Sequence, residues 1–270
     1  MNKKPQGEEY PLYGGRVNLV YNPHEHSYIA NGKNIAGSTT IAGLMPKPWM
    51  KYYVKKYAKI DIEKAWKKEG HTLKDFIYAL GASERYGNWA MGIGTNTHNG
   101  IQGWLESEKL PSPQCQEEMN CLHAFWFFQM KYNFKPTLIE RPCCFTETDE
   151  NGEEIPLYAG RPDGVGILEE KITLVDWKTS AGLQYENWPQ PASYAEALNR
   201  EMDFDPKLKK RIGGKIEQLA LVNVRKDGSL DVRISTNWEV EFKVFMHLLA
   251  IEKYRSAKKD KNGLLINKQI

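Results

Sequence analysis

The sequence has few cysteines, and none are spaced as in a thiolate metal site or a redox motif. Its four cysteines, Cys115, Cys121, Cys143 and Cys144, include no Cys-x-x-Cys pair within 270 residues. Zinc sites and disulfide-rich domains have denser and more regular cysteine patterns. We therefore expect reduced, mostly structural thiols and a protein that works in the cytoplasm.

The sequence also lacks long apolar runs, internal repeats and low-complexity segments. No stretch approaches the roughly 20 apolar residues that span a bilayer, so we expect no association with a membrane. The first 15 residues, MNKKPQGEEYPLYGG, lack the apolar core of a secretion signal and carry acids that a mitochondrial presequence avoids. A formal net charge of +3 is compatible with a polyanionic partner but does not by itself indicate one.

The apolar content is sufficient for a large core. Hydrophobic residues make up 41% of the chain, and eight tryptophans are among its aromatic residues. Apolar periodicity and turn residues predict helices in the first half and mostly strands in the second. The expected elements are short strands over 16–36 with a turn at Asn31-Gly32, helices over 38–80 broken at Pro46 and Pro48, helices over 92–110 and 117–132, a strand over 137–148, a hairpin within 158–182, a helix over 191–199, a hairpin around Asp227-Gly228, and a last helix to about 259 capped by Thr236 and Glu239.

Two acids and a lysine lie in the stretch YAGRPDGVGILEEKITLVDWKTSAG, residues 158–182. An acid-x-base triplet such as Asp176-Trp177-Lys178 is common by chance in a chain with 34 acids and 37 bases. Here it ends the run ITLV, which is typical of a strand buried on both faces. Because residues i and i+2 of a strand project to the same side, Asp176 and Lys178 need each other, a metal or solvent as a partner.

Asp163 precedes Asp176 by thirteen positions. If the two runs pair through the turn at 169–171, the two carboxylates face each other on neighbouring strands and repel unless a cation lies between them. Oxygen ligands from two strands suit Mg²⁺ or Mn²⁺. We also expect Gly160 and Gly164 to allow close approach of a nucleic-acid backbone. The plain alternative is a surface cluster of ion pairs at strand ends.

These motifs carry a family resemblance. GRPDGVG…ITLVDWKTS resembles the PD-(D/E)XK nuclease superfamily, with Asp163 as the motif aspartate and Asp176-x-Lys178 as the acid-x-Lys element. GTNTH at 94–98 is similar to the Gly-x-x-x-His helix of RecB-like nucleases, and QPASY at 190–194 to their Gln-x-x-x-Tyr helix. The order and spacing of these motifs also resemble the mitochondrial genome maintenance exonuclease and phage nucleases of the same group. The phage relatives share, in addition, an N-terminal pattern like that at 26–48.

The resemblance implies an α/β fold with a restriction-endonuclease-like core, in which a central mixed β-sheet is flanked by helices and preceded by a helical N-terminal elaboration. It implies a single nuclease domain over 1–270, with a β start and helical part to 135 and the catalytic sheet core and C-terminal helix over 136–270. The implied activity is a divalent-metal-dependent DNA exonuclease acting on single strands or DNA ends in phage or bacterial replication, recombination or repair. A structure-specific or restriction-like endonuclease and a non-catalytic DNA-binding module stay as alternatives.

The resemblance also implies partners and cofactors. DNA is the expected substrate and Mg²⁺ or Mn²⁺ the expected cofactor; the oligomeric state is open, with a monomer favoured. Cluster-bearing relatives place three cysteines near the C-terminus, whereas the last cysteine here is Cys144, so we expect no iron–sulfur cluster. The lambda-exonuclease branch of the superfamily usually has an acidic residue in place of His98, so the resemblance favours the RecB-like group over that branch. A phage-encoded protein would work in the host cytoplasm.

By the same resemblance, each candidate side chain has an implied role. The metal ligands would be His98, Asp163, Asp176 and the carbonyl of Trp177. Lys178 would activate or orient water, and Gln190 and Tyr194 would position phosphate or Lys178, unless they only support the sheet. Glu140 would contact metal-bound water or Lys178, or is a plain edge-strand charge.

Expected DNA contacts are more scattered along the chain. They comprise Arg161, Thr179, Ser38, Thr39, Lys51 and Tyr53. Ser38 and Thr39 suit either a helix cap or a phosphate site. The lysine- and aromatic-rich segment 49–68 suits either single-stranded DNA or a solvated amphipathic helix.

Overall fold

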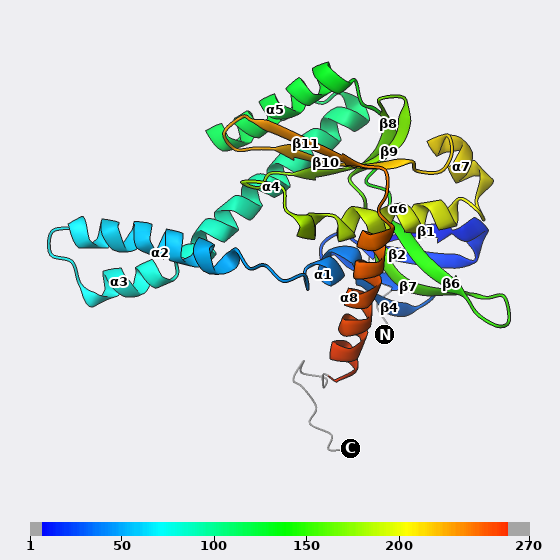
Figure 1. Cartoon of the computed structure of the whole chain (residues 1–270), viewed down its shortest axis with the longest axis horizontal. Helices are drawn as coiled ribbons and strands as arrows, with labels where there is room; N and C mark the ends of the chain where they lie inside the picture. The colour runs from blue at the N-terminus through cyan, green and yellow to red at the C-terminus, as the bar shows by residue number, and fades with distance from the viewer. Residues whose placement is uncertain (1–6, 259–270) are drawn as a thin grey trace.

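Two mixed β-sheets form the centre of the fold, and α-helices cover their faces. The computed structural model describes residues 7–258 (Figure 1). In spatial order, the first sheet consists of β1 (Glu8–Leu12), β2 (Val17–Asn22), β3 (Ser27–Ala30), β4 (Lys33–Gly37), β7 (Glu154–Gly160) and β6 (Cys143–Thr148). The second consists of β11 (Leu230–Ser235), β10 (Gln218–Val224), β9 (Lys171–Lys178), β8 (Gly164–Leu168) and β5 (Lys135–Ile139). The fold is therefore mixed α/β, as expected.

The helices follow the expected order. They are α1 (Ser38–Ala42), α2 (Met50–Lys67), α3 (Leu73–Leu80), α4 (Ala82–Ser107), α5 (Gln116–Tyr132), α6 (Pro189–Glu201), α7 (Pro206–Ile212) and α8 (Glu239–Ala257). The expected helix over 92–110 is the second half of the longer α4, which ends at Ser107. The expected cap of the last helix is wrong: Trp238 is the N-cap residue, and no side-chain cap bond forms. Within residues 7–258, no helix is both long and apolar enough to cross a membrane.

The N-terminal strands join the sheet built by the second half of the chain. The β3–β4 turn contains Asn31 and Gly32, both with positive φ, as a type I′ hairpin turn requires. β4 then pairs in parallel with β7, with Ala36 opposite Tyr158. Segments more than a hundred residues apart therefore share one sheet.

Two crossings between the sheets replace the single central sheet that the sequence predicts. The expected strand over 137–148 is interrupted at residues 140–142, and its halves β5 and β6 lie in different sheets. The chain crosses back at residues 161–163, between β7 and β8. Each crossing contains a proline, Pro142 or Pro162, which has no amide proton for strand pairing. Glu140 also has a φ of 47°, outside the strand region.

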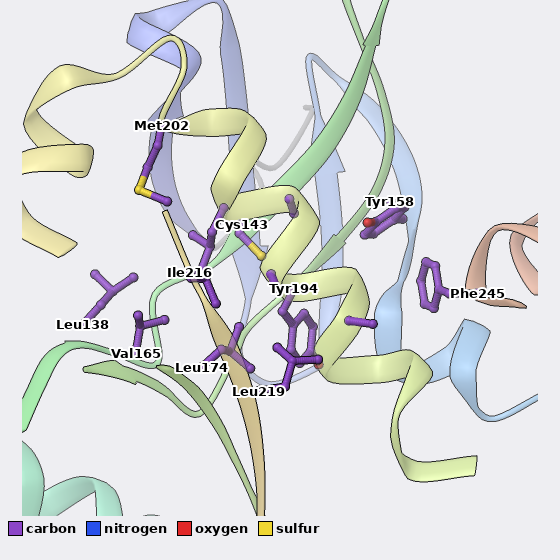
Figure 2. Close-up of a cluster of buried hydrophobic side chains, with 14 of the residues drawn as sticks. Leu138, Cys143, Tyr158, Val165, Leu174, Tyr194, Met202, Ile216, Leu219 and Phe245 are labelled. Carbon is purple, nitrogen blue, oxygen red and sulfur yellow. The ribbon is translucent and has the colours of Figure 1, made fainter. Parts of the chain in front are cut away.

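The predicted hairpin is present as β8 and β9, and alternation along β9 divides the core. Val175 and Trp177 pack in the cluster that includes Phe125 and Phe128 of α5. Leu174 faces the opposite cluster, which includes much of α6 (Figure 2). By alternation, Asp176 and Lys178 lie on the α6 side of the sheet.

The helical hairpin α2–α3 projects from the body of the molecule, next to the far end of α4 (Figure 1). α2 packs against both α3 and α4. The aromatic rings of Tyr53, Tyr57 and Tyr86 lie between α2 and α4, with centroid separations of 4.6 and 4.3 Å. The second half of α4 returns to the body, where it packs against α5.

We predict that Gly160→Ala destabilises the fold. A methyl group there would collide with the ring of Tyr194 and come within 2.8 Å of the Ser38 hydroxyl. Overpacking of this kind costs about 1–3 kcal/mol. Gly92→Ala in α4 is the control: its methyl group would meet nothing within 4 Å, and alanine would favour the helix by up to about 1 kcal/mol. Urea unfolding of both variants measures the difference, and equal stability would contradict the packing argument.

Candidate active site

Asp163 connects the second crossing to the end of β9. Its carboxylate Oδ2 accepts a hydrogen bond of 2.7 Å from the amide of Trp177. Gly164 and Val175 form the last aligned pair of the antiparallel strands β8 and β9. Asp163, just before Gly164, and Asp176, just after Val175, are therefore the next residues at the same end of the two strands. The juxtaposition that the sequence predicts is therefore present.

His98 approaches this pair from α4. Its Nδ1 lies 3.5 Å from Oδ1 of Asp163. One turn earlier, a side chain at Gly94 would lie 3.2 Å from the Thr179 hydroxyl, just beyond the end of β9. The Gly-x-x-x-His spacing thus allows the helix to come close to β9 and directs the imidazole to Asp163.

A chain of hydrogen bonds positions Lys178. Its ammonium group lies 2.6 Å from Oδ2 of Asp176 and donates to Oε1 of Gln190 at 3.3 Å. The amide nitrogen of Gln190 donates to the hydroxyls of Thr39 (3.0 Å) and Tyr194 (2.9 Å). These two bonds direct the amide oxygen of Gln190 toward Lys178. Three elements, α1, β9 and α6, therefore contribute to the network that positions this ammonium group.

Glu140 and Arg161 flank the carboxylates, one on each crossing between the sheets. Arg161 Nε lies 2.6 Å from Oε2 of Glu140, and its guanidinium carbon lies 5.1 Å from the centroid of the Tyr21 ring. The backbone amide of Glu140 donates to the carbonyl of Asp163. Glu140 is thus neither on a strand nor in contact with Lys178; it pairs with Arg161 beside the site.

Burial and mutual charge separate the pKa values of the three acids. Burial raises the pKa of Asp176 to about 6, with the Asp163 charge adding to the rise. Burial alone would raise the pKa of Asp163, but the nearby positive charge of His98 and Lys178 holds that pKa below its usual value. Burial and the Asp163 charge raise the pKa of Glu140 to about 7, which the Arg161 guanidinium only partly offsets.

Both basic groups gain affinity for protons from these acids. Burial lowers the pKa of Lys178, but the charges of Asp176 and Asp163 outweigh it and raise the pKa above its ordinary value. In the same way, Asp163 outweighs the burial of His98 and raises the pKa of that imidazole. Lys178 is therefore an ammonium ion at neutral pH in this state of the site.

Several predicted DNA contacts lie elsewhere or serve the fold. The buried Ser38 hydroxyl donates to the carbonyl of Ala159 and caps nothing, since Gly37 is the N-cap residue of α1. Lys51 and Tyr53 lie on the projecting α2. The expectation for the glycines is wrong: Gly160 lies against Tyr194, and Gly164 lies near Phe134. Both glycines are buried and do not face a surface that nucleic acid could reach, and only at Gly160 does close packing exclude a side chain.

Sequence reasoning missed two residues near the site. The ammonium group of Lys226, in the β10–β11 turn, donates to the carbonyl of Thr179 at 2.6 Å. The indole nitrogen of Trp49 donates to Glu186, in the loop between Lys178 and Gln190, at 2.7 Å. No local pattern marks either residue, because each contact joins segments far apart in the sequence.

The donors suit a hard divalent cation in kind, since two carboxylates and an imidazole come from separate elements. Among residues 7–258, no three His, Cys, Asp or Glu side chains converge as a ready-made ion site. Instead, Asp176 pairs with Lys178 and Asp163 with His98. A cation would replace these contacts and relieve the repulsion between the two acids.

Comparison with known proteins adds little to this geometry. No family model and no curated protein matches the chain. The crystal structure of SSO0001 is similar with a TM-score of 0.33 and 12% identity, over 80% of this chain and 88% of that one. An alkaline exonuclease from Laribacter hongkongensis is similar with a TM-score of 0.25 and 12% identity, over 61% of this chain and 85% of that one.

We predict that Glu140→Gln changes stability in a pH-dependent way. The folded chain raises the pKa of Glu140 from 4.5 to about 7, so this group's contribution to stability falls as pH rises from about 4.5 to about 7. Glutamine does not titrate, so the variant gains up to about 3 kcal/mol on the wild type across that window. Urea unfolding in EDTA at several pH values measures the gain. The exposed Glu147→Gln is the control, and a pH-independent difference for Glu140→Gln would contradict the prediction.

Proposed function

We propose that this chain is a divalent-metal-dependent nuclease that hydrolyses phosphodiester bonds in DNA. The observation that carries the proposal is the convergence of Asp163, Asp176 and Lys178 at one end of β9, with His98 on one side and Gln190 on the other. Ion pairs that only stabilise a fold do not need an ammonium group oriented by an amide, which is itself oriented by two hydroxyls. We propose an exonuclease acting on single strands or DNA ends.

Each side chain has a part in this reaction. Asp163, Asp176, His98 and the carbonyl of Trp177 would hold Mg²⁺ or Mn²⁺, which when bound would stabilise negative charge on the scissile phosphate and make bound water more acidic. Lys178 would orient the attacking water and stabilise the charge that develops on phosphate oxygens. Arg161, partly exposed beside the site, would contact a neighbouring phosphate once it leaves Glu140.

We predict that purified protein degrades labelled DNA with Mn²⁺ and not in EDTA. Asp176→Asn and Lys178→Met should each reduce the rate by about 10²-fold or more, because each removes charge from the reacting centre. Lys207→Met on α7, far along the chain from the site, is the control for loss of one lysine. The midpoint temperature of thermal unfolding should rise on addition of Mn²⁺ for the wild type and for Lys178→Met, but not for Asp176→Asn. If DNA stays intact, or if Asp176→Asn is as active as the wild type, the nuclease proposal fails.

The form of the DNA separates the possible activities. An exonuclease degrades linear DNA and leaves covalently closed circles intact, whereas an endonuclease of the same fold cuts both. Labels on the 5′ or the 3′ end then give the polarity. Binding without cleavage under every condition would favour a non-catalytic DNA-binding module.

We predict that Thr39 is a positioning residue. Thr39→Val removes one of the two acceptors that orient Gln190, so the amide can turn its oxygen away from Lys178. Loss of one hydrogen bond of about 1 kcal/mol corresponds to roughly a fivefold lower kcat, with KM little changed. Thr39→Ser keeps the acceptor and should restore kcat. A change in KM with an unchanged kcat, or no recovery of kcat in Thr39→Ser, would contradict this role.

A further inference from the structure

The positive charge of the chain is concentrated on α2 and its approach. Residues 47–68 contain eight lysines and two acids, a net charge of +6, whereas the whole chain carries +3. The remaining residues together are therefore net negative. This separation matters because a local basic surface attracts polyanions even when the net charge of the protein is small.

The exposed face of α2 combines these lysines with aromatic rings. At 100° per residue, one half of the helix surface contains Lys51, Lys55, Lys56, Lys59, Tyr52, Ile62, Glu63, Trp66 and Lys67. Tyr53 and Tyr57 lie on the other half, which packs toward α4. We call the first set the outer face of α2.

The outer face has charges that protein acids do not neutralise. Within the described part of the chain, Lys59 pairs with Glu63, while Lys51, Lys55, Lys56 and Lys67 have no ion-pair partner. By contrast, Lys64 and Lys68, which line a hollow between α2, α3 and α4, are paired with Asp61 and Asp75. Arg85 also pairs with Asp61 there, so each basic side chain of the hollow has an acidic partner, whereas most lysines of the outer face have none.

Large aromatic side chains are exposed on the same face. Tyr52 is 65% exposed and Trp66 is 69% exposed. The ammonium group of Lys51 lies 5.0 Å from the centre of the Tyr52 ring. Trp66 stacks on His71, with ring centroids 5.2 Å apart, whereas among the described residues the Tyr52 ring is stacked on no other ring and is free to contact a base. Rings interleaved with lysines are what a single strand uses, since bases stack on the rings and phosphates pair with the ammonium groups.

The outer face begins at the edge of the candidate active site. Trp49, the N-cap residue of α2, donates a hydrogen bond to Glu186. Glu186 lies in the segment that links Lys178 to Gln190, two residues of the candidate active site. Thr39, which bonds to Gln190, precedes α2 by eleven residues. From there α2 extends about 27 Å, at 1.5 Å per residue, away from the body (Figure 1).

We propose that the outer face of α2 binds single-stranded DNA that continues beyond the active site, with lysines holding phosphates and Tyr52 stacking on a base. This inference deepens the proposed function, because it takes DNA as the substrate. It identifies the strand form that the protein prefers and the surface responsible. It also gives the projecting hairpin a purpose that packing alone does not provide.

The test is binding of a fluorescent 30-nucleotide thymidine strand in EDTA, where no hydrolysis is expected. The triple variant Lys51→Gln, Lys55→Gln and Lys56→Gln should lower affinity at least tenfold and reduce the slope of log affinity against log salt by about 2, since each lost contact to a single strand contributes about 0.7. Lys207→Gln, Lys209→Gln and Lys210→Gln on α7 removes the same charge elsewhere and should have little effect. Equal losses in the two triple variants would overturn the proposal.

A second variant separates stacking from charge. Tyr52→Ala should lower affinity about fivefold or more with an unchanged salt slope, and Tyr52→Phe should restore it, because stacking needs the ring and not the hydroxyl. A duplex of equal length should bind more weakly than the single strand. If the duplex binds as tightly and Tyr52→Ala has no effect, or if polyglutamate of equal charge competes as well as DNA, the single-strand assignment is wrong.

These measurements do not depend on catalysis. If wild-type protein fails to cleave DNA with Mn²⁺ but loses binding through the α2 variants, the nuclease proposal fails and the α2 proposal stands. If cleavage of a very short strand is normal in the triple lysine variant while cleavage of the 30-nucleotide strand is weakened, both stand.

Discussion

The bond from the Trp177 amide to the carboxylate of Asp163 holds together the parts on which the site depends. It fixes the second crossing between the two sheets to the end of β9, where the indole of Trp177 is buried against α5 and the neighbouring Asp176 and Lys178 face α6. Successive side chains of a strand point to opposite faces of the sheet. Because Trp177 points into the α5 cluster, its neighbours Asp176 and Lys178 must both point to the opposite face. The hydrophobic core and the polar site are thus two faces of one strand.

Electrostatic balance is the second constraint. Two acids and two basic groups are enclosed together, and burying any one of them alone would cost several kcal/mol. Asp163 has His98, Lys178 and the Trp177 amide to stabilise its negative charge, whereas at Asp176 burial outweighs the ion pair with Lys178. The pKa of Asp163 is therefore lowered while that of Asp176 is raised. Similar residues on one hairpin thereby acquire different affinities for protons.

Much of the site could be predicted from the sequence because its parts lie in short, regular patterns. The hairpin places Asp163 near Asp176 through strand pairing, and helical spacing places Gly94 and His98, or Gln190 and Tyr194, on common faces. The two-sheet arrangement could not be predicted in this way. A proline in the sequence is compatible both with a bulge inside a strand and with the end of that strand. The positive φ of Glu140 is visible only in the structure, because tertiary packing sets it. The contacts of Thr39 and Trp49 likewise join segments more than a hundred residues apart.

The same separation between core and projection explains how one chain can hold both a balanced site and an unbalanced surface. Near β9, low exposure forces each charge to find a partner, so the site carries little net charge of its own. On the outer face of α2, solvent screens the lysines, and most of them remain unpaired at little cost in stability. A positive surface that joins the body beside a nearly neutral site attracts a polyanion without trapping the reacting phosphate. Affinity for a long strand and chemistry on one bond can therefore be set by different residues.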